Sequence, residues 1–155
     1  MSFKNVKKTV GIALTLTLTA VTVSAEQSSV GDVESSIEMR QQAFKTIEND
    51  TKAAKIQLNE RDVDWQGLLA VSERLVANSE LLPATFVANS HQGSKAKESI
   101  WRNPGKFEQL LSEMREGYAI VLKASQSHDV DLAEKGLKTA QATCQSCHRT
   151  YRSRW

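Results

Sequence analysis

A row of side chains in residues 31–58 recurs at alternating steps of four and three, and it restricts the fold more than any other feature. Such steps return to one side of an α-helix, so the row predicts one face of a long helix packed in a bundle. Its members are Val33, Ile37, Arg40, Phe44, Ile47, Thr51, Ala54 and Leu58. Thr51 is small enough to be buried, whereas Arg40 is a charge on a buried face and needs a partner.

The remainder of the chain also favours helices. It contains two prolines and seven glycines, and β-branched residues do not alternate with polar ones after residue 25. Further helices are expected at about 63–82, from 103–104 to about 123, and from about 129 to the end. Their ends are marked by Asp62 or Asp64 as a cap, Pro83 as a stop, Asn103-Pro104 as a cap and first residue, and Asp129 or Asp131 as the last cap.

Four helices joined mainly by short connections predict an all-α fold, an antiparallel four-helix bundle. In this scaffold, cofactor sites are built between facing helices. The longest irregular segment of the mature chain is expected at 84–99. A loop of that length in a small domain is often functional.

Residues 1–25 have the features of a cleaved secretory signal peptide. A basic start with three lysines precedes an apolar stretch at 10–21, and the small residues at 23–25 form a cleavage site. The apolar stretch is short for a membrane span, and an uncleaved anchor is the alternative. We therefore expect a mature domain at 26–155, exported to the periplasm, with no membrane association after cleavage.

The charge balance argues against a nucleic-acid partner. The chain has 20 Lys and Arg residues against 18 Asp and Glu residues, and three of the lysines lie in the signal peptide. The mature domain thus carries 17 cationic groups against 18 acidic ones. No basic stripe with interleaved aromatic residues is present, as a nucleic-acid surface would require.

The only two cysteines lie in the run Cys144-Gln145-Ser146-Cys147-His148. This spacing is typical of covalently attached haem c, in which two thiols add to the vinyl groups of one porphyrin and the neighbouring imidazole binds the iron. Residues three and four apart share a helix face, so all three side chains can reach one haem. We predict thioethers at Cys144 and Cys147 and axial ligation of the iron by His148.

Two other interpretations of the motif are weaker. A thioredoxin-like pair would lie at a helix N-terminus after a strand, where the helix dipole lowers a thiol pKa, but this pair comes at the end of an expected helix. A zinc site would need a fourth ligand. Only His91, His128 or a carboxylate could supply it.

Taken together, these motifs resemble cytochrome c′, a family of periplasmic monohaem four-helix-bundle proteins. The most specific piece is the terminal Cys144-x-x-Cys147-His148-x-x-Tyr151-Arg152, because most other small c-type cytochromes carry the attachment motif near the N-terminus. The resemblance covers essentially the whole mature chain. Its supporting pieces are Arg40-Gln41-Gln42-Ala43-Phe44, Leu82-Pro83-x-x-Phe86, and Ile100-Trp101 followed by Phe107.

The resemblance implies haem contacts for the matching residues. They are Arg40, Gln41 and Lys95 against the propionates, Phe44 and Phe86 with Ile47 over the distal face, and His148 and Arg152 on the proximal side. Lys95 falls where the family often has an acidic residue. Phe44 stands where many members have leucine, so the size of the distal pocket is expected to differ.

The expected function follows from the sixth coordination position of the iron. Low-spin relatives place a methionine near the position of Phe44, whose ring cannot bind iron. Met39, the nearest sulfur, lies about 100° round the helix from Arg40. The resemblance therefore implies a five-coordinate iron that binds nitric oxide and carbon monoxide at an apolar site, for buffering or detoxification of nitric oxide and for electron transfer.

Other expectations concern partners and alternative functions. A low-spin electron-transfer monohaem cytochrome with a sixth protein ligand is the alternative. An enzyme is not expected, because no acid, base or nucleophile is placed beside the distal face. Expected partners are the diatomic gases and an unidentified periplasmic redox protein. A second copy of the chain is also a candidate, since family members are often dimers through their first two helices.

Overall fold

The structure is a computed structural model that describes residues 24–154, with side chains from residue 30 onward. It contains four long helices, which are α1 (Ser24–Leu58), α2 (Trp65–Leu81), α4 (Gly105–Ser127) and α5 (Val130–Tyr151). A 3-10 turn, η1 (Leu82–Thr85), and the short helix α3 (Ser99–Arg102) lie between α2 and α4. Within the described residues there is no strand, so the all-α prediction is confirmed. Most of the predicted signal peptide lies outside this range.

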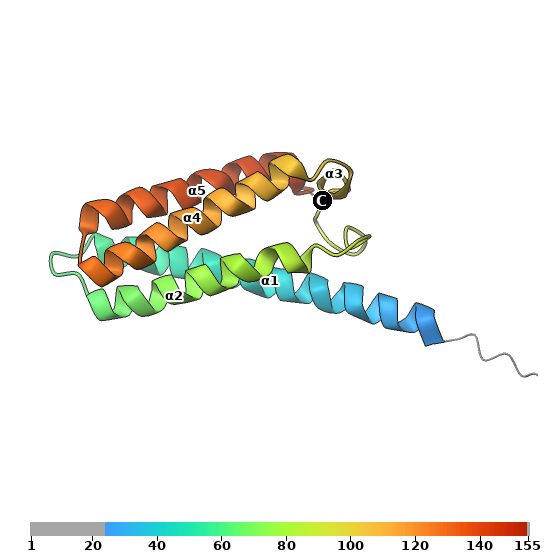
Figure 1. The fold of residues 1–155 in the computed structure, drawn as a ribbon, viewed down its shortest axis with the longest axis horizontal. Helices are drawn as coiled ribbons and strands as arrows, with labels where there is room; N and C mark the ends of the chain where they lie inside the picture. Colours follow the sequence, from blue (N-terminus) through green and yellow to red (C-terminus); the bar gives the residue numbers. More distant parts are fainter. Residues whose placement is uncertain (1–23, 155) are drawn as a thin grey trace, which may run out of the picture.

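The long helices form the predicted antiparallel four-helix bundle (Figure 1). Helices α4 and α5 pack most extensively, α2 packs beside both α1 and α4, and α1 packs against α5 less extensively than against α2. The first turns of α1 extend beyond the ends of the other helices (Figure 1). Loop 86–98, α3 and the C-terminal end of α5 gather at one end of the bundle. The candidate site lies at this end.

Aspartates cap two of the helices. The Asp64 carboxylate accepts a hydrogen bond of 3.0 Å from the Gly67 amide at the start of α2. Asp129 accepts one of 2.9 Å from the Leu132 amide at the start of α5. Each satisfies a backbone N–H that the first helical turn leaves without a partner. Of the two pairs of alternatives, Asp64 and Asp129 are therefore the caps.

Two predicted helix ends, one predicted cap and the predicted effect of Pro83 differ from the structure. Helix α1 begins at Ser24 instead of 31, and α4 continues to Ser127 instead of ending near 123. Helix α2 ends at Leu81, one residue before the predicted end, but the helical path continues because Pro83 lies at the start of η1, where a proline needs no amide hydrogen. Asn103 ends α3 and does not cap α4, whose N-cap is Pro104 without a side-chain hydrogen bond.

Two glycines allow the close packing of α4 against α5. A Cβ atom at Gly117 would lie 2.6 Å from the Ala140 nitrogen and 2.8 Å from the Gly136 oxygen. A Cβ atom at Gly136 would lie 2.7 Å from the Gly117 oxygen. Backbone atoms cannot move aside as a flexible side chain can, so only glycine fits at both positions.

The buried face of α1 differs from the predicted row at one important residue. Arg40, Ile47 and Thr51 are buried as expected. Ala43, however, is buried at 1% exposure, whereas its neighbour Phe44 is 37% exposed. The face that packs against the bundle is therefore rotated toward Ala43, and Phe44 lies at its edge. This leaves an aromatic ring partly uncovered on α1.

Candidate haem site

The two cysteines lie in the last turns of α5, as the motif predicts. Both side chains are half-buried. Burial raises the pKa of Cys144, and burial together with the nearby Cys144 and Glu113 raises the pKa of Cys147 to about 11. Cys147 packs against the hydrophobic core. A half-buried pair of thiols on one helix face has the placement needed to hold the edge of a porphyrin.

The raised thiol pKa values argue against the thioredoxin-like interpretation of the motif. A thioredoxin-like pair would need a lowered thiol pKa, and here both pKa values are raised. A zinc site would need further ligands. Among the described residues, no group of three or more His, Cys, Asp or Glu side chains is arranged to hold a metal ion.

His148 follows Cys147 directly and is exposed. Its pKa is lowered by partial burial first and then by the charge of Arg152, while Glu48 on α1 acts in the opposite direction. A lowered pKa favours the neutral imidazole, which is the form that binds iron. Glu48 on α1 is thus near enough to His148 for each to influence the pKa of the other.

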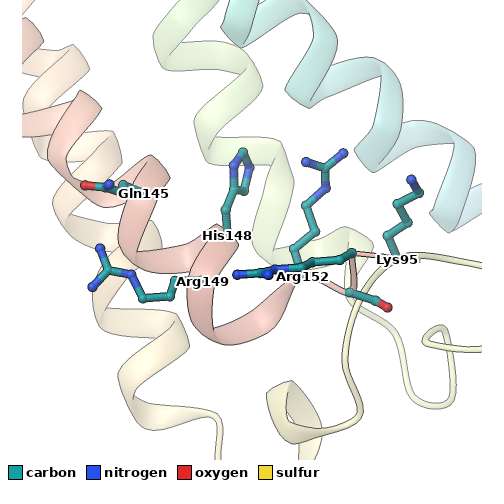
Figure 2. A pocket seen from close by; sticks show the side chains of 7 residues that line it. Lys95, Gln145, His148, Arg149 and Arg152 are labelled. Carbon is teal, nitrogen blue, oxygen red and sulfur yellow. The ribbon is translucent and has the colours of Figure 1, made fainter.

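A basic pocket of about 470 Å³ surrounds His148 (Figure 2). Its size is typical of a site for a small ligand or cofactor. His148 and Lys95 project in the same direction, whereas Arg149 and Gln145 lie on the other flank. The full lining consists of Lys95, Gln145, His148, Arg149, Arg152, Ser153 and Arg154. The structure thus brings Lys95 and Arg152, two predicted haem contacts, to the side of His148.

An aromatic cluster lies between α1 and the loop. The rings of Phe44 and Phe86 meet edge to face, with centroids 6.5 Å apart at an angle of 73°. The ring centroids of Phe107 and Phe86 are 4.7 Å apart. Trp101 packs on the Phe86 ring, and its indole N–H donates a 3.0 Å hydrogen bond to the Phe86 carbonyl oxygen. Phe44 and Phe86, predicted to share the distal pocket, are therefore neighbours.

Arg40 is 4% exposed, as its place in the row predicts, and its hydrogen-bond partners are in η1 and loop 86–98. Its Nη1 donates to the Thr85 oxygen at 3.2 Å and to Ser90 Oγ at 2.7 Å, and its Nη2 donates to the Ser90 oxygen and to Ser94 Oγ at 2.7 Å. The guanidinium carbon also lies 4.9 Å from the centroid of the Phe86 ring. The contact of Arg40 with a haem propionate stays a prediction.

Three further residues that the sequence singled out are Met39, Gln41 and His91. Gln41 is exposed on α1, so its haem contact also stays a prediction. Met39 is 46% exposed, in line with its place off the buried row. His91, expected to be an ordinary exposed loop residue, is half-buried against Trp101, and its Nδ1 is buried without a hydrogen-bond partner. Sequence reasoning missed Ser90 and the other loop partners of Arg40, because single serines carry no signal.

The described residues fit a covalently bound haem. The thiols of Cys144 and Cys147 and the imidazole of His148 lie on one end of α5. Helix α1 packs against α5 much less extensively than α4 does, and it presents the partly exposed ring of Phe44. Cations that could pair with propionates line the pocket beside His148.

Comparisons with known proteins agree with this assignment. A family model described as Cytochrome C′ matches residues 35–152. Cytochrome c-554 of Cereibacter sphaeroides is 32% identical over 79 residues, which make up 51% of this chain and 59% of that protein. Cytochrome c-556 of Agrobacterium tumefaciens (strain B2A) is 29% identical over 99 residues, which make up 64% of this chain and 80% of that protein. The chain therefore matches little more than half of the Cereibacter protein.

The fold comparison gives the same result. The structure of cytochrome c prime from Shewanella frigidimarina superposes with a TM-score of 0.71 at 22% identity. The superposition covers 78% of this chain and 96% of that one. The family model spans more than half of the chain, from the first third of α1 to the residue after α5. The chain therefore belongs to the cytochrome c′ family and is a c-type haem protein.

Proposed function

We propose that this chain is a periplasmic haem protein that takes up nitric oxide and carbon monoxide at a five-coordinate iron. Cys144 and Cys147 hold the haem through thioethers, and His148 is the axial ligand. When bound, the haem supplies an iron that can bind diatomic gases and exchange an electron. The remaining residues of the site determine which ligands can approach.

The observation that carries this proposal is the contact between Phe44 and Phe86. Their rings lie 6.5 Å apart, and Phe44 is 37% exposed one helical turn beyond Arg40. Neither ring can bind iron or donate a hydrogen bond. Such a face favours small neutral ligands and offers no donor to stabilise bound oxygen.

The periplasmic location rests on the predicted signal peptide and on the cofactor, since covalent haem attachment is expected in an exported protein. Among the described residues, no helix is both long and apolar enough to cross a membrane. Large apolar side chains are exposed at Met39 and Ile56 on α1 and at Leu81 on α2. They support self-association through these two helices, which sedimentation velocity would detect.

The alternative is a low-spin electron-transfer cytochrome with a sixth protein ligand. Met39 would be the candidate ligand, but it is 46% exposed and lies off the face that carries Arg40. The optical spectrum of the purified protein decides between the two. A high-spin Soret band supports the open site, and a low-spin band contradicts it.

Substitutions at Phe44 test the open site directly. Phe44→Met should place a sulfur within reach of the iron and turn the spectrum low-spin. Ile56→Met is the matched control, because Ile56 is a 63% exposed residue of the same helix and lies away from the cluster. Phe44→Ala should bind carbon monoxide roughly ten- to a hundredfold more tightly, because moving a ring aside costs about 1 to 3 kcal/mol. A high-spin Phe44→Met variant together with unchanged carbon monoxide binding in Phe44→Ala would overturn the proposal.

The attachment is tested separately. The intact mass should equal residues 26–155 plus one haem, and acidified organic solvent should leave the colour with the protein. Free thiols at Cys144 and Cys147, or haem that can be extracted, would contradict the thioether assignment.

A further inference from the structure

Four cationic side chains gather in the pocket beside His148. They belong to Lys95 in the loop, Arg149 on α5, and Arg152 and Arg154 just after α5. All four are exposed, and among the described residues none forms an ion pair with a carboxylate. Glu48 is an acidic residue whose pKa is influenced by the charges of His148 and Arg152. Its carboxylate, however, is already paired with Lys52 at 2.6 Å.

The chain holds these cations together through backbone contacts between distant segments. The Ser153 amide donates to the Lys95 oxygen at 2.8 Å, and the Lys97 amide donates to the Tyr151 oxygen at 2.9 Å. Ala96 and Arg152 form an antiparallel bridge between the same segments. The clustering of positive charge is therefore imposed by tertiary structure and does not arise only from neighbours in sequence.

Such an arrangement is unfavourable in the isolated protein, because like charges held side by side repel one another. The mature domain is nearly neutral, with 17 cationic groups against 18 acidic ones, so the excess is local. A haem carries only two propionates. Even if both pair in this pocket, two of the four cations stay without a counter-charge.

The chemistry of the patch distinguishes between anionic partners. Three of its cations are arginines, whose planar guanidinium groups pair bidentately with carboxylates. A membrane-binding surface would combine cations with exposed apolar side chains that enter the lipid. The large apolar residues that are exposed among the described residues, Val30, Met39, Phe44, Ile56 and Leu81, all lie on α1 and α2.

We propose that the patch formed by Lys95, Arg149, Arg152 and Arg154 is a docking site for the acidic face of a partner protein. The proposal deepens the proposed function, since the partner would bind beside the axial ligand His148. Arg149 and Arg154 are the residues with which to test it, because neither is among the predicted haem contacts.

The test measures binding of a decaglutamate peptide to the holoprotein by isothermal titration calorimetry at low salt. The double variant Arg149→Glu/Arg154→Glu should bind at least roughly tenfold more weakly, a loss of about 1.4 kcal/mol. Arg115→Glu/Lys123→Glu is the matched control, since it makes the same change of net charge at exposed positions on α4. The control should retain most of the affinity. Binding to the unmodified protein should weaken as salt screens the charges.

Thermal unfolding gives a second readout. Because the cations repel one another, Arg154→Gln should raise the melting temperature at low salt, and the peptide should raise that of the unmodified protein. Both effects should fade at high salt. A melting temperature that falls in Arg154→Gln at low salt would contradict the repulsion on which the proposal rests.

Two outcomes would overturn the docking site. Equal loss of peptide binding in the patch variant and the α4 control would show that only net charge matters. Tighter binding to phosphatidylglycerol vesicles than to the peptide, lost in the patch variant, would show a membrane surface instead of a protein partner. Neither result depends on the spin state of the iron, so a failure here is distinguishable from a failure of the gas-binding proposal.

Discussion

The Tyr118 hydroxyl on α4 and the Thr51 hydroxyl on α1 share a buried hydrogen bond of 2.9 Å. Tyr118 is completely buried, and Thr51 is 8% exposed. The bond crosses the bundle, and Tyr118 lies close enough to Cys144 for the thiol to influence its pKa. Thr51 is one of the two polar members of the row on α1, and this bond is what satisfies it.

Thr51→Val should therefore destabilise the protein by about 1 to 3 kcal/mol, because it leaves a buried phenol hydroxyl without a partner. Tyr118→Phe should cost less, since the remaining threonine hydroxyl can bond within its own helix. The free energy of unfolding in urea, measured for both single variants and the double variant, gives the coupling. If the two effects simply add, the bond does not contribute to stability in the way described.

Tyr118 also predicts a pH dependence at alkaline pH. Burial raises its pKa to about 12, although the Thr51 hydrogen bond acts in the opposite direction. The unfolded chain releases the phenol proton near pH 10, so between about pH 10 and 12 only the folded protein retains it. Stability is thus complete below pH 10 and declines as the pH rises, by up to roughly 2.7 kcal/mol at 1.36 kcal/mol per unit. Tyr118→Phe should lack this part of the decline, and parallel curves for the two proteins would disprove it.

Gly117→Ala should destabilise the protein by roughly 1 to 3 kcal/mol, as expected for overpacking. The added methyl group would meet the Ala140 nitrogen at 2.6 Å, and neither helix can yield without shifting its neighbour. Gly31→Ala is the control, because nothing lies within 4 Å of a Cβ atom there. It should leave stability unchanged or raise it by up to about 1 kcal/mol. Similar losses in both variants would indicate a general effect of replacing glycine.

Arg40→Met should keep the bundle folded but release the loop. The Thr85 and Ser90 carbonyl oxygens and Ser94 Oγ would lose their donor, which should cost about 1 to 3 kcal/mol. Ser94 Oγ also accepts from the Ala96 amide, so hydrogen exchange at 94–97 should accelerate.

The same variant tests the predicted contact with the propionates. Loss of a cation near the haem should change the reduction potential. Arg74→Met, which removes a pair with Asp50 between α1 and α2, is the control for both measurements. Faster hydrogen exchange in Arg40→Met with an unchanged reduction potential would show that Arg40 holds the loop and does not contact the haem.

Much of the fold could be predicted because its signals are local. Helix periodicity and aspartate caps depend on residues within one or two turns, so the four helices followed from sequence, and each of the two caps was narrowed to a pair of aspartates. Prolines predicted the helix ends less reliably. Pro83 and Pro104 each lie where one helical segment gives way to another, and the local rules do not say whether the path continues.

The candidate site likewise has a part that local sequence predicted and a part that it did not. The motif Cys144-x-x-Cys147-His148 is contiguous, so its placement on one helix end was predictable from spacing alone. The row on α1 indicated that Arg40 is buried and needs a partner. It could not indicate Ser90 and Ser94, which are far along the chain.

Sequence by itself determined that this chain forms four helices, carries an attachment motif at the end of the last one, and buries a charge on the first. Tertiary structure decided that Ala43 and not Phe44 faces the core, because neighbouring helices set the rotation of α1 within its apolar arc. It also decided that Lys95 lies beside Arg152, since that pairing joins segments more than fifty residues apart through backbone hydrogen bonds. Periodicity records which side of one helix is apolar, and contacts between distant segments depend on how all the helices pack together.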